Sequence, residues 1–178
     1  MFDNSANTHQ VAMFRYFIER AILKQNSARK KRTEAPLYED IKTVLILFNA
    51  VDMRHIQKAK TTLLKDGKQV YLWGINHTSI SYGHSQSTIM ETSELNILGY
   101  PRKAYVDEFQ LLGADIIVNM SREYSPALTY LMTLNDKIPI RVGYKGNDPL
   151  LYDFILDEQI DEHVDFLFKA LLTFLGKN

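Results

Sequence analysis

Polar side chains that can bind a small ligand gather where the apolar segments of the chain end. The set comprises Asn49, Asp52, Asn119, Ser121, Arg122 and Tyr144. Arg122 carries a planar guanidinium that can bind a phosphate or carboxylate through two parallel hydrogen bonds, and Asp52 is a candidate general base. Ligands of open parallel sheets bind beyond the carboxyl ends of the strands. The set therefore predicts a ligand site at that edge of a sheet.

Helix capping is an alternative explanation for some of these residues. Asp52 and Ser121 each precede a predicted helix, and Asp and Ser are common where a side chain caps the free amide groups of a first turn. Arg122 and Glu123 would then be solvated or paired with nearby charges. The sequence leaves both explanations open.

Motifs of several enzyme classes are absent. The turn after residues 43–48 reads Asn-Ala-Val-Asp without a glycine, so the chain has neither a dinucleotide-binding fingerprint nor a P-loop there. HExxH and GxSxG are missing as well, and the lack of cysteine excludes disulfides and thiolate zinc sites. His77 and His84 lack the spacing and partners of metal ligands. We expect no cofactor and no metal, and whether the protein is an enzyme stays open.

The central elements that position the candidate residues lie in residues 114–145. Apolar runs at 116–118 and 138–142 flank a helix-period segment at 126–134. The two runs are separated by about twenty residues, which suits a crossover helix and is too long for a hairpin. We therefore predict two neighbouring parallel strands joined by a right-handed crossover.

The same reasoning along the chain predicts a Rossmann-like α/β domain over residues 33–178. Further strands are expected at 43–48, 69–73, 94–98 and 151–156, and further helices at 53–65, 102–112 and 157–175. The expected architecture is a three-layer domain with a mainly parallel sheet of about five strands in an order near 3-2-1-4-5. Residues 76–93 are polar and are expected to be irregular.

Residues 1–32 are predicted to form a basic helical arm. Apolar residues recur every three or four positions, at Val11, Phe14, Phe17, Ile18, Ala21 and Ile22. The arm ends in a cationic cluster, Arg29, Lys30, Lys31 and Arg32. The helix either packs on the sheet, with its cations favoured by the C-terminal helix dipole, or docks on an anionic partner such as RNA, a ribosome or a membrane surface.

Composition narrows the environment of the protein. The 178 residues suit a single domain, and 21 basic side chains balance 21 acidic ones, so no overall charge recruits an anionic substrate. The apolar runs are too short to span a bilayer, and the first residues lack the pattern of a secretory signal. We expect no transmembrane segment and a cytoplasmic location.

The segments TVLILFNAVD and LNILGYP, together with residues 114–157, resemble a small family of uncharacterised proteins from Bacteroidota. That family is defined only as a domain of unknown function. The similarity runs from about residue 11 to the final helix. It implies no particular activity.

More distantly, the chain resembles the N-terminal half of the heptosyltransferase-like (GT-B) glycosyltransferases. Their small-residue turn with an aspartate falls on Asp52, and their Arg-x-Gly segment falls on residues 141–143. Val51 stands where that turn prefers glycine, and the domain that binds the nucleotide sugar in those enzymes is missing. The resemblance therefore implies a shared architecture more than a shared reaction.

These observations predict a binding or interaction protein that is not catalytic and contacts an anionic partner through its basic N-terminal helix. The alternative is a glycosyltransferase-like enzyme or a small-ligand-binding domain. Its site would lie at the carboxyl ends of the strands.

Overall fold

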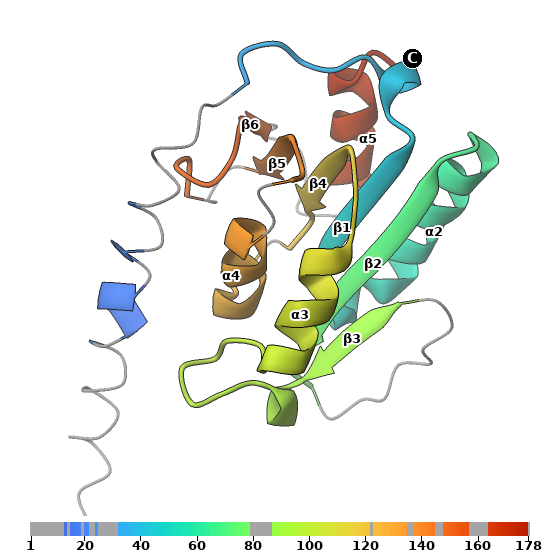
Figure 1. The fold of residues 1–178 in the computed structure, drawn as a ribbon. Coiled ribbons are helices and arrows are strands. Elements are labelled where there is room, and N and C mark those ends of the chain that lie inside the picture. The colour runs from blue at the N-terminus through green and yellow to red at the C-terminus, as the bar shows by residue number, and fades with distance from the viewer. Residues whose placement is uncertain are drawn as a thin grey trace, which may run out of the picture.

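A sheet of six parallel strands forms the centre of the structure, a computed structural model, in the order β3-β2-β1-β4-β5-β6 (Figure 1). The structure describes residues 13, 15–18, 20–21, 24, 32–78, 87–121, 123–134, 137–144, 148–156 and 164–177. The strands are β1 (Thr43–Asn49), β2 (Gln69–Asn76), β3 (Thr88–Glu91), β4 (Ile116–Asn119), β5 (Ile140–Tyr144) and β6 (Phe154–Leu156). The α-helices are α2 (Met53–Lys65), α3 (Lys103–Leu111), α4 (Pro126–Leu134) and α5 (Val164–Phe174). Three short 3-10 helices are η1 (Tyr38–Asp40), η2 (Ala50–Asp52) and η3 (Thr92–Glu94).

The parallel pairing predicted for the middle of the chain is confirmed. Ile116 of β4 lies opposite Ile140 of β5, and Val118 lies opposite Val142. The chain winds from β1 through β2 to β3 on one side, then crosses to β4 and winds to β6 on the other. The winding thus reverses between β1 and β4, as in a Rossmann-like fold, and a sixth strand extends the predicted order.

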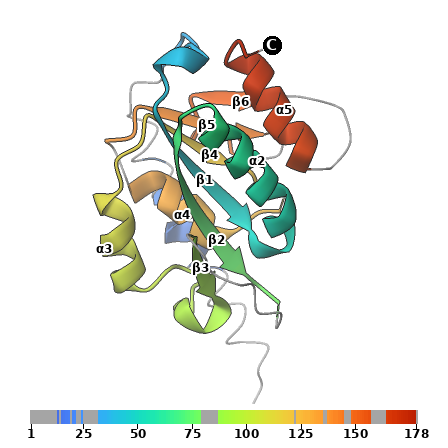
Figure 2. The ribbon, with the colours of Figure 1, turned by 90° about the vertical axis from the view of Figure 1, so that its right-hand side faces the viewer.

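Helices α2 and α5 cover one face of the sheet, and α3 and α4 cover the other (Figure 2). Phe48 of β1 belongs to the apolar layer that includes α2 and α5, whereas its neighbour Leu47 belongs to the layer that includes α4. Because both faces of β1 are buried, its sequence is apolar at successive positions instead of alternating with polar residues. This double burial explains the run TVLILF.

The predicted edge strand at residues 94–98 is wrong. The edge strand is β3, which lies inside the stretch expected to be irregular. Glu91, the last residue of β3, and Glu94 form a reciprocal capping box on the short helix η3. The Glu91 and Glu94 side chains accept hydrogen bonds from backbone amide groups of this turn. Polar residues in this stretch therefore do not indicate an irregular loop.

Helix α3 was predicted to turn Ala104, Val106, Phe109 and Leu112 inward; Phe109 is buried, and Val106 and Leu112 are partly buried. Ala104, expected to face inward, is exposed, whereas Tyr105 and Phe109 pack edge-on against Trp73 with ring centroids 6.4 and 5.1 Å apart. Large aromatic side chains bury more apolar area than an alanine does, and they determine which side of the helix meets the sheet.

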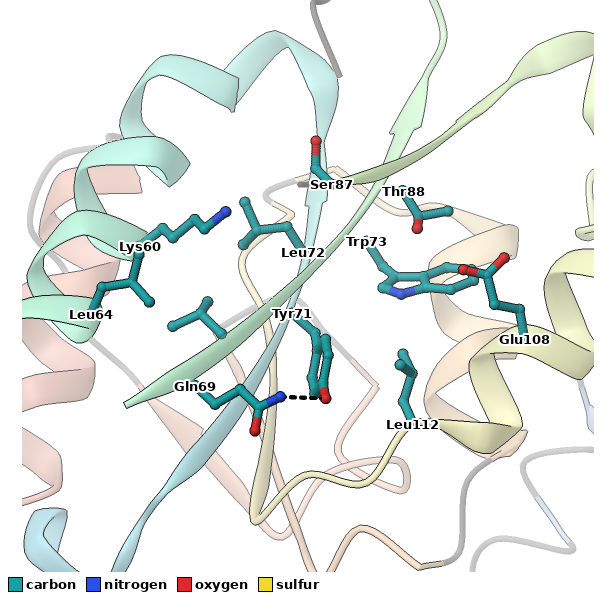
Figure 3. A pocket seen from close by; sticks show the side chains of 11 residues that line it. Lys60, Leu64, Gln69, Tyr71, Leu72, Trp73, Ser87, Thr88, Glu108 and Leu112 are labelled. Carbon is teal, nitrogen blue, oxygen red and sulfur yellow. Dashed lines mark hydrogen bonds between the residues drawn. The ribbon is translucent and has the colours of Figure 1, made fainter. Parts of the chain in front are cut away.

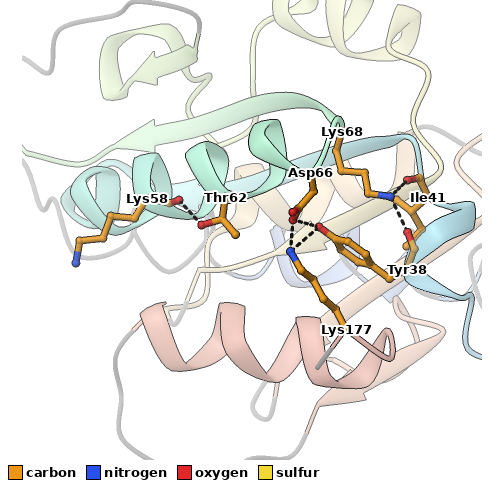
Figure 4. Close-up of polar contacts among 7 residues, drawn as sticks. All are labelled: Tyr38, Ile41, Lys58, Thr62, Asp66, Lys68 and Lys177. Carbon is orange, nitrogen blue, oxygen red and sulfur yellow. Dashed lines mark hydrogen bonds and ion pairs between the residues drawn. The ribbon is translucent and has the colours of Figure 1, made fainter.

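A polar cluster ties η1 to the ends of α2 and α5 (Figure 4). The Tyr38 hydroxyl donates a hydrogen bond of 2.6 Å to the Asp66 carboxylate, which also forms an ion pair with Lys177. The Lys68 ammonium group donates to the backbone carbonyl groups of Tyr38 and Ile41, at 2.7 and 2.6 Å. The cluster therefore joins segments that are far apart in the sequence.

We expect Asp66→Asn to weaken the pH dependence of folding. Hydrogen bonds from Lys177 and Tyr38 lower the pKa of the Asp66 carboxyl group below its ordinary 3.8. A pKa lowered by folding stabilises the protein above the unfolded-state pKa, and the stabilisation is lost as the pH falls through the lowered value. Urea unfolding from neutral pH to about pH 2.5 measures this, with Asp107→Asn as the exposed control. Parallel loss of stability in wild type and Asp66→Asn would contradict the expectation.

Gly74→Ala should destabilise the sheet. A Cβ atom on Gly74 would lie 2.7 Å from Cζ of Phe48, a side chain that is fully buried and cannot move aside cheaply. Overpacking of this kind costs about 1–3 kcal/mol of unfolding free energy. Gly113→Ala is the control, because its Cβ would meet no atom within 4 Å. Equal stability of the two variants in chemical denaturation would show that the Phe48 ring yields.

Candidate functional site

Three of the predicted ligand-binding residues meet at the carboxyl ends of β1 and β4. The Asn49 side-chain amide donates to the Ser121 hydroxyl at 2.8 Å, and the Ser121 backbone amide donates to Oδ1 of Asn119 at 3.0 Å. The Asn119 side-chain amide donates to the Tyr152 hydroxyl at 2.8 Å. Asn49, Asn119 and Ser121 are all buried. We call these four residues the strand-end cluster.

The orientation of the Asn49 amide follows from its neighbour. The Ser121 hydroxyl donates its proton to the backbone carbonyl of Glu123 at 2.7 Å, so it can only accept from Asn49. Nδ2 of Asn49 must therefore face Ser121. Oδ1 of Asn49, on a residue only 5 % exposed, is left buried with no hydrogen-bond partner in the described part of the chain. Such an oxygen costs about 1–3 kcal/mol and marks a place for a donor group.

Capping does not explain Asp52 and Ser121. Asp52 lies in η2, directly before α2, and its side chain makes no capping hydrogen bond to that helix. Ser125, which was not predicted as a site residue, accepts a hydrogen bond of 3.4 Å from the Leu128 backbone amide at the start of α4. Asp52 is buried beside the end of β1. Capping of a helix by the side chain thus accounts for neither Asp52 nor Ser121.

Tyr144 is not brought to the strand-end cluster. It lies in the apolar layer of α2 and α5, and its hydroxyl donates to the Leu167 backbone carbonyl at 2.6 Å. Arg122 lies outside the described residues, so its contribution to the site stays a prediction.

Tyr152 was not predicted as a site residue because residues 151–156 were predicted to form the last strand. The structure places it in a loop before β6, among the residues of the α3 and α4 face. Burial raises the pKa of its hydroxyl to about 12, despite the hydrogen bond from Asn119, which lowers it. The hydroxyl therefore stays neutral and can accept a hydrogen bond from Asn119.

The strand-end cluster can bind a ligand mainly through hydrogen bonds. Its polar groups are amides and hydroxyls, with the buried Asp52 carboxylate as the acidic group nearest in sequence to Asn49. In the described ranges, no group of three or more His, Asp or Glu residues is placed to hold a metal ion. The arrangement suits the binding of a polar ligand better than proton transfer.

The described residues of the N-terminal segment form a second candidate site. Residues 13, 15–18, 20, 21 and 24 are helical. Arg15 and Ile18 are half-buried, and the Arg15 guanidinium lies 5.9 Å from the centroid of the Tyr124 ring. These two residues lie on the side of the helix that faces the rest of the protein.

The opposite side of this helix is exposed and combines apolar with cationic groups. Met13, Tyr16 and Phe17 are 59 %, 52 % and 62 % exposed. A period of 3.6 residues places Arg20 and Lys24 on the same side, and both are exposed. We call these five residues the exposed helix face. Phe17 and Ala21, predicted as part of a buried stripe, are thus in contact with solvent.

Of the cationic cluster that follows, Arg29, Lys30 and Lys31 lie outside the described residues. Arg32 is exposed, and its backbone amide donates to the Asp153 carboxylate at 3.1 Å. Its role in binding an anionic partner stays a prediction.

The fold and the strand-end cluster define the class of this protein: a Rossmann-like α/β domain with polar groups where the winding of its sheet reverses. A model of a family of unknown function, DUF6913, matches residues 15–177, and the chain belongs to that family. This confirms the resemblance to an uncharacterised domain. The resemblances to proteins from Bacteroidota and to glycosyltransferases stay predictions.

No curated protein and no solved structure matched the chain. Among the described residues, no helix is both long enough and apolar enough to cross a membrane.

Proposed function

We propose that this is a non-catalytic interaction protein that docks on an anionic membrane surface through its N-terminal helix. The observation that carries the proposal is the exposed helix face, on which three large apolar side chains lie beside two cations. Helices of this kind lie in the plane of the membrane interface, with apolar side chains inserted at the boundary between headgroups and acyl chains.

The apolar residues favour a membrane over RNA or a ribosome. Cations alone suffice to bind nucleic acid phosphates, and that binding would leave Met13 and Phe17 without a function. Anionic lipids are enriched in the cytoplasmic leaflet, and each nearby Lys or Arg contributes about 1 kcal/mol to binding there. A cytoplasmic location is therefore part of the proposal, and the cluster Arg29–Arg32 adds to the attraction.

Replacing both Met13 and Phe17 by Ser should weaken binding to vesicles of phosphatidylcholine and phosphatidylglycerol. Each apolar side chain buried in the membrane contributes about 1.5–3 kcal/mol, so the double variant should bind at least about a hundredfold more weakly in co-sedimentation. The matched control replaces two other exposed apolar residues, Ile97 and Leu111, by Ser.

The cations give a second arm to this experiment. Lys30→Ala, Lys31→Ala and Arg32→Ala together should reduce binding and make the remainder less sensitive to salt. The proposal is contradicted if wild type binds pure phosphatidylcholine vesicles as well as anionic ones. Binding that is equally weakened by the Ile97 and Leu111 control would contradict it too.

A second candidate function is the binding of a small polar ligand at the strand-end cluster. It is supported by the buried Oδ1 of Asn49, which lacks a hydrogen-bond partner among the described residues. A ligand hydroxyl or amine would supply the missing donor, with Asp52, Asn119 and Ser121 alongside and Arg122 as a further proposed contact. Sugars and sugar phosphates carry such groups, so this candidate function is compatible with the glycosyltransferase-like alternative.

A thermal-shift screen of sugars, sugar phosphates and nucleotides tests this candidate. A ligand at about one hundred times its dissociation constant stabilises the folded state by about 2.7 kcal/mol. Asn49→Ala should abolish the shift. Asn76→Ala is the control, because Asn76 is a buried strand-end amide that donates to Glu91 and accepts from Thr78. A shift that survives in Asn49→Ala, or no shift with any compound, removes the support for this site.

A further inference from the structure

Tyr16 and Arg20 form a pair on the exposed helix face. Nε of Arg20 donates a hydrogen bond of 3.1 Å to the Tyr16 hydroxyl, and the guanidinium carbon lies 5.4 Å from the centroid of the Tyr16 ring. Residues four positions apart are neighbours on a helix. The Tyr16 ring also packs edge-on against Phe17, with the ring centroids 5.9 Å apart. The pair thus places a cation directly beside the apolar side chains of this face.

One edge of the Arg20 guanidinium remains open to a ligand. Arginine has five N–H donors, and the hydrogen bond to Tyr16 uses only the donor on Nε. In the part of the chain that the structure describes, no residue accepts a hydrogen bond from either Nη atom of Arg20. The Tyr16 hydroxyl accepts from Nε, so its own proton is available to a ligand as well. Donors on both side chains can therefore reach one ligand.

These open donors suit a phosphate monoester. The two Nη groups of Arg20 match the spacing of two oxygen atoms on a phosphate or a carboxylate. A phosphate monoester has three terminal oxygens and a charge of about −1.5 to −2 at pH 7. It can therefore accept from both Nη groups and from the Tyr16 hydroxyl at once. A phosphate diester has only two terminal oxygens and carries less charge, so the arrangement favours a monoester.

The position of the pair on the helix suits a phosphate at a membrane surface. Met13 and Phe17 would insert at the boundary between headgroups and acyl chains, and tyrosine side chains are enriched at the level of the headgroups. The Tyr16 and Phe17 rings are in contact, so Arg20 would reach the lipid phosphates while Phe17 inserts more deeply. Lys24 adds positive charge on the same side but lacks a planar fork of donors.

We propose that Tyr16 and Arg20 bind the terminal phosphate of a lipid that is a phosphate monoester, such as phosphatidic acid. Arg20 binds the phosphate through both Nη groups. Tyr16 positions the guanidinium and donates a hydrogen bond from its hydroxyl to a third oxygen. This site rests on the proposed docking of the helix on an anionic membrane, and it gives that docking a lipid preference.

Helix α2 offers a comparison within the same protein. Leu64 is 48 % exposed beside an exposed cation, Lys65, and it lines a groove of about 580 Å³ between α2 and α3 (Figure 3). An apolar side chain next to a cation thus occurs elsewhere on the surface. Lys65 has no planar fork, however, and no aromatic ring among the described residues lies against it. Lys65→Ala therefore serves as the control for the loss of one exposed positive charge.

Arg20→Lys tests the fork, because it keeps the charge and removes the planar pair of donors. Wild type should bind phosphatidylcholine vesicles that contain phosphatidic acid more tightly than vesicles with the same fraction of phosphatidylglycerol. Arg20→Lys should bind the phosphatidic acid vesicles roughly tenfold more weakly than wild type in co-sedimentation. Its binding to the phosphatidylglycerol vesicles should change by less than about threefold. Lys65→Ala should bind both kinds of vesicle as wild type does.

Tyr16→Phe tests the positioning of the guanidinium, because it removes the hydroxyl and keeps the ring. It should weaken binding to phosphatidic acid vesicles roughly fivefold, the effect of about one hydrogen bond. The double variant with Arg20→Lys should lose less than the product of the two single losses, since both side chains act on one phosphate. A loss equal to that product would show that Tyr16 does not position Arg20.

The outcomes separate this phosphate site from the docking itself. Equal loss of binding to both kinds of vesicle in Arg20→Lys would overturn the phosphate site and leave the docking of the helix intact. Equal binding of wild type to the two kinds of vesicle would do the same. Failure of wild type to bind any anionic vesicle would overturn the docking, and the phosphate site with it.

Discussion

Parallel pairing of β1 with β2 and β4 is the interaction on which the rest of the structure depends. Strands that run in the same direction must be joined by crossovers, and these place helices on both faces of the sheet. The central residues of β1 are consequently fully buried. The same pairing brings the ends of β1 and β4 together, where the hydrogen bond from Asn49 to Ser121 links the two halves of the winding.

We propose two places where the protein meets other molecules, and they differ in physical character. The strand-end cluster is closed and polar, with a single buried oxygen in need of a donor. The exposed helix face combines apolar side chains, which water solvates poorly, with cationic side chains, which it solvates well. The strand-end cluster suits a small ligand, and the exposed helix face suits a surface.

The sequence predicted much of this fold because burial on both faces produces long apolar runs. Helix α2 has the bounds predicted for it, and Gly67 ends it with a positive φ of 75°, as expected of a glycine after a helix. β3 was not predicted, since four residues on an edge produce too short a pattern. The buried side of α3 was predicted only in part. The spacing of apolar residues does not show that aromatic side chains bury more area than an alanine does.

The candidate site was predicted correctly at the ends of β1 and β4 and not elsewhere. Asn49, Asn119 and Ser121 meet because the carboxyl ends of β1 and β4 coincide. Tyr144 lies on the opposite face of the sheet. Its face could not be predicted from the sequence, because a strand that is buried on both sides does not alternate apolar with polar residues. Tyr152 comes from a loop whose position depends on the whole fold.

Hydrogen exchange of the full chain with and without phosphatidylglycerol vesicles tests the docking role most directly. The account predicts slower exchange in residues 13–24 on addition of vesicles, with no change in β1 and β4. Unchanged exchange in residues 13–24 while the protein is bound to the vesicles would contradict it, because another surface would then carry the interaction.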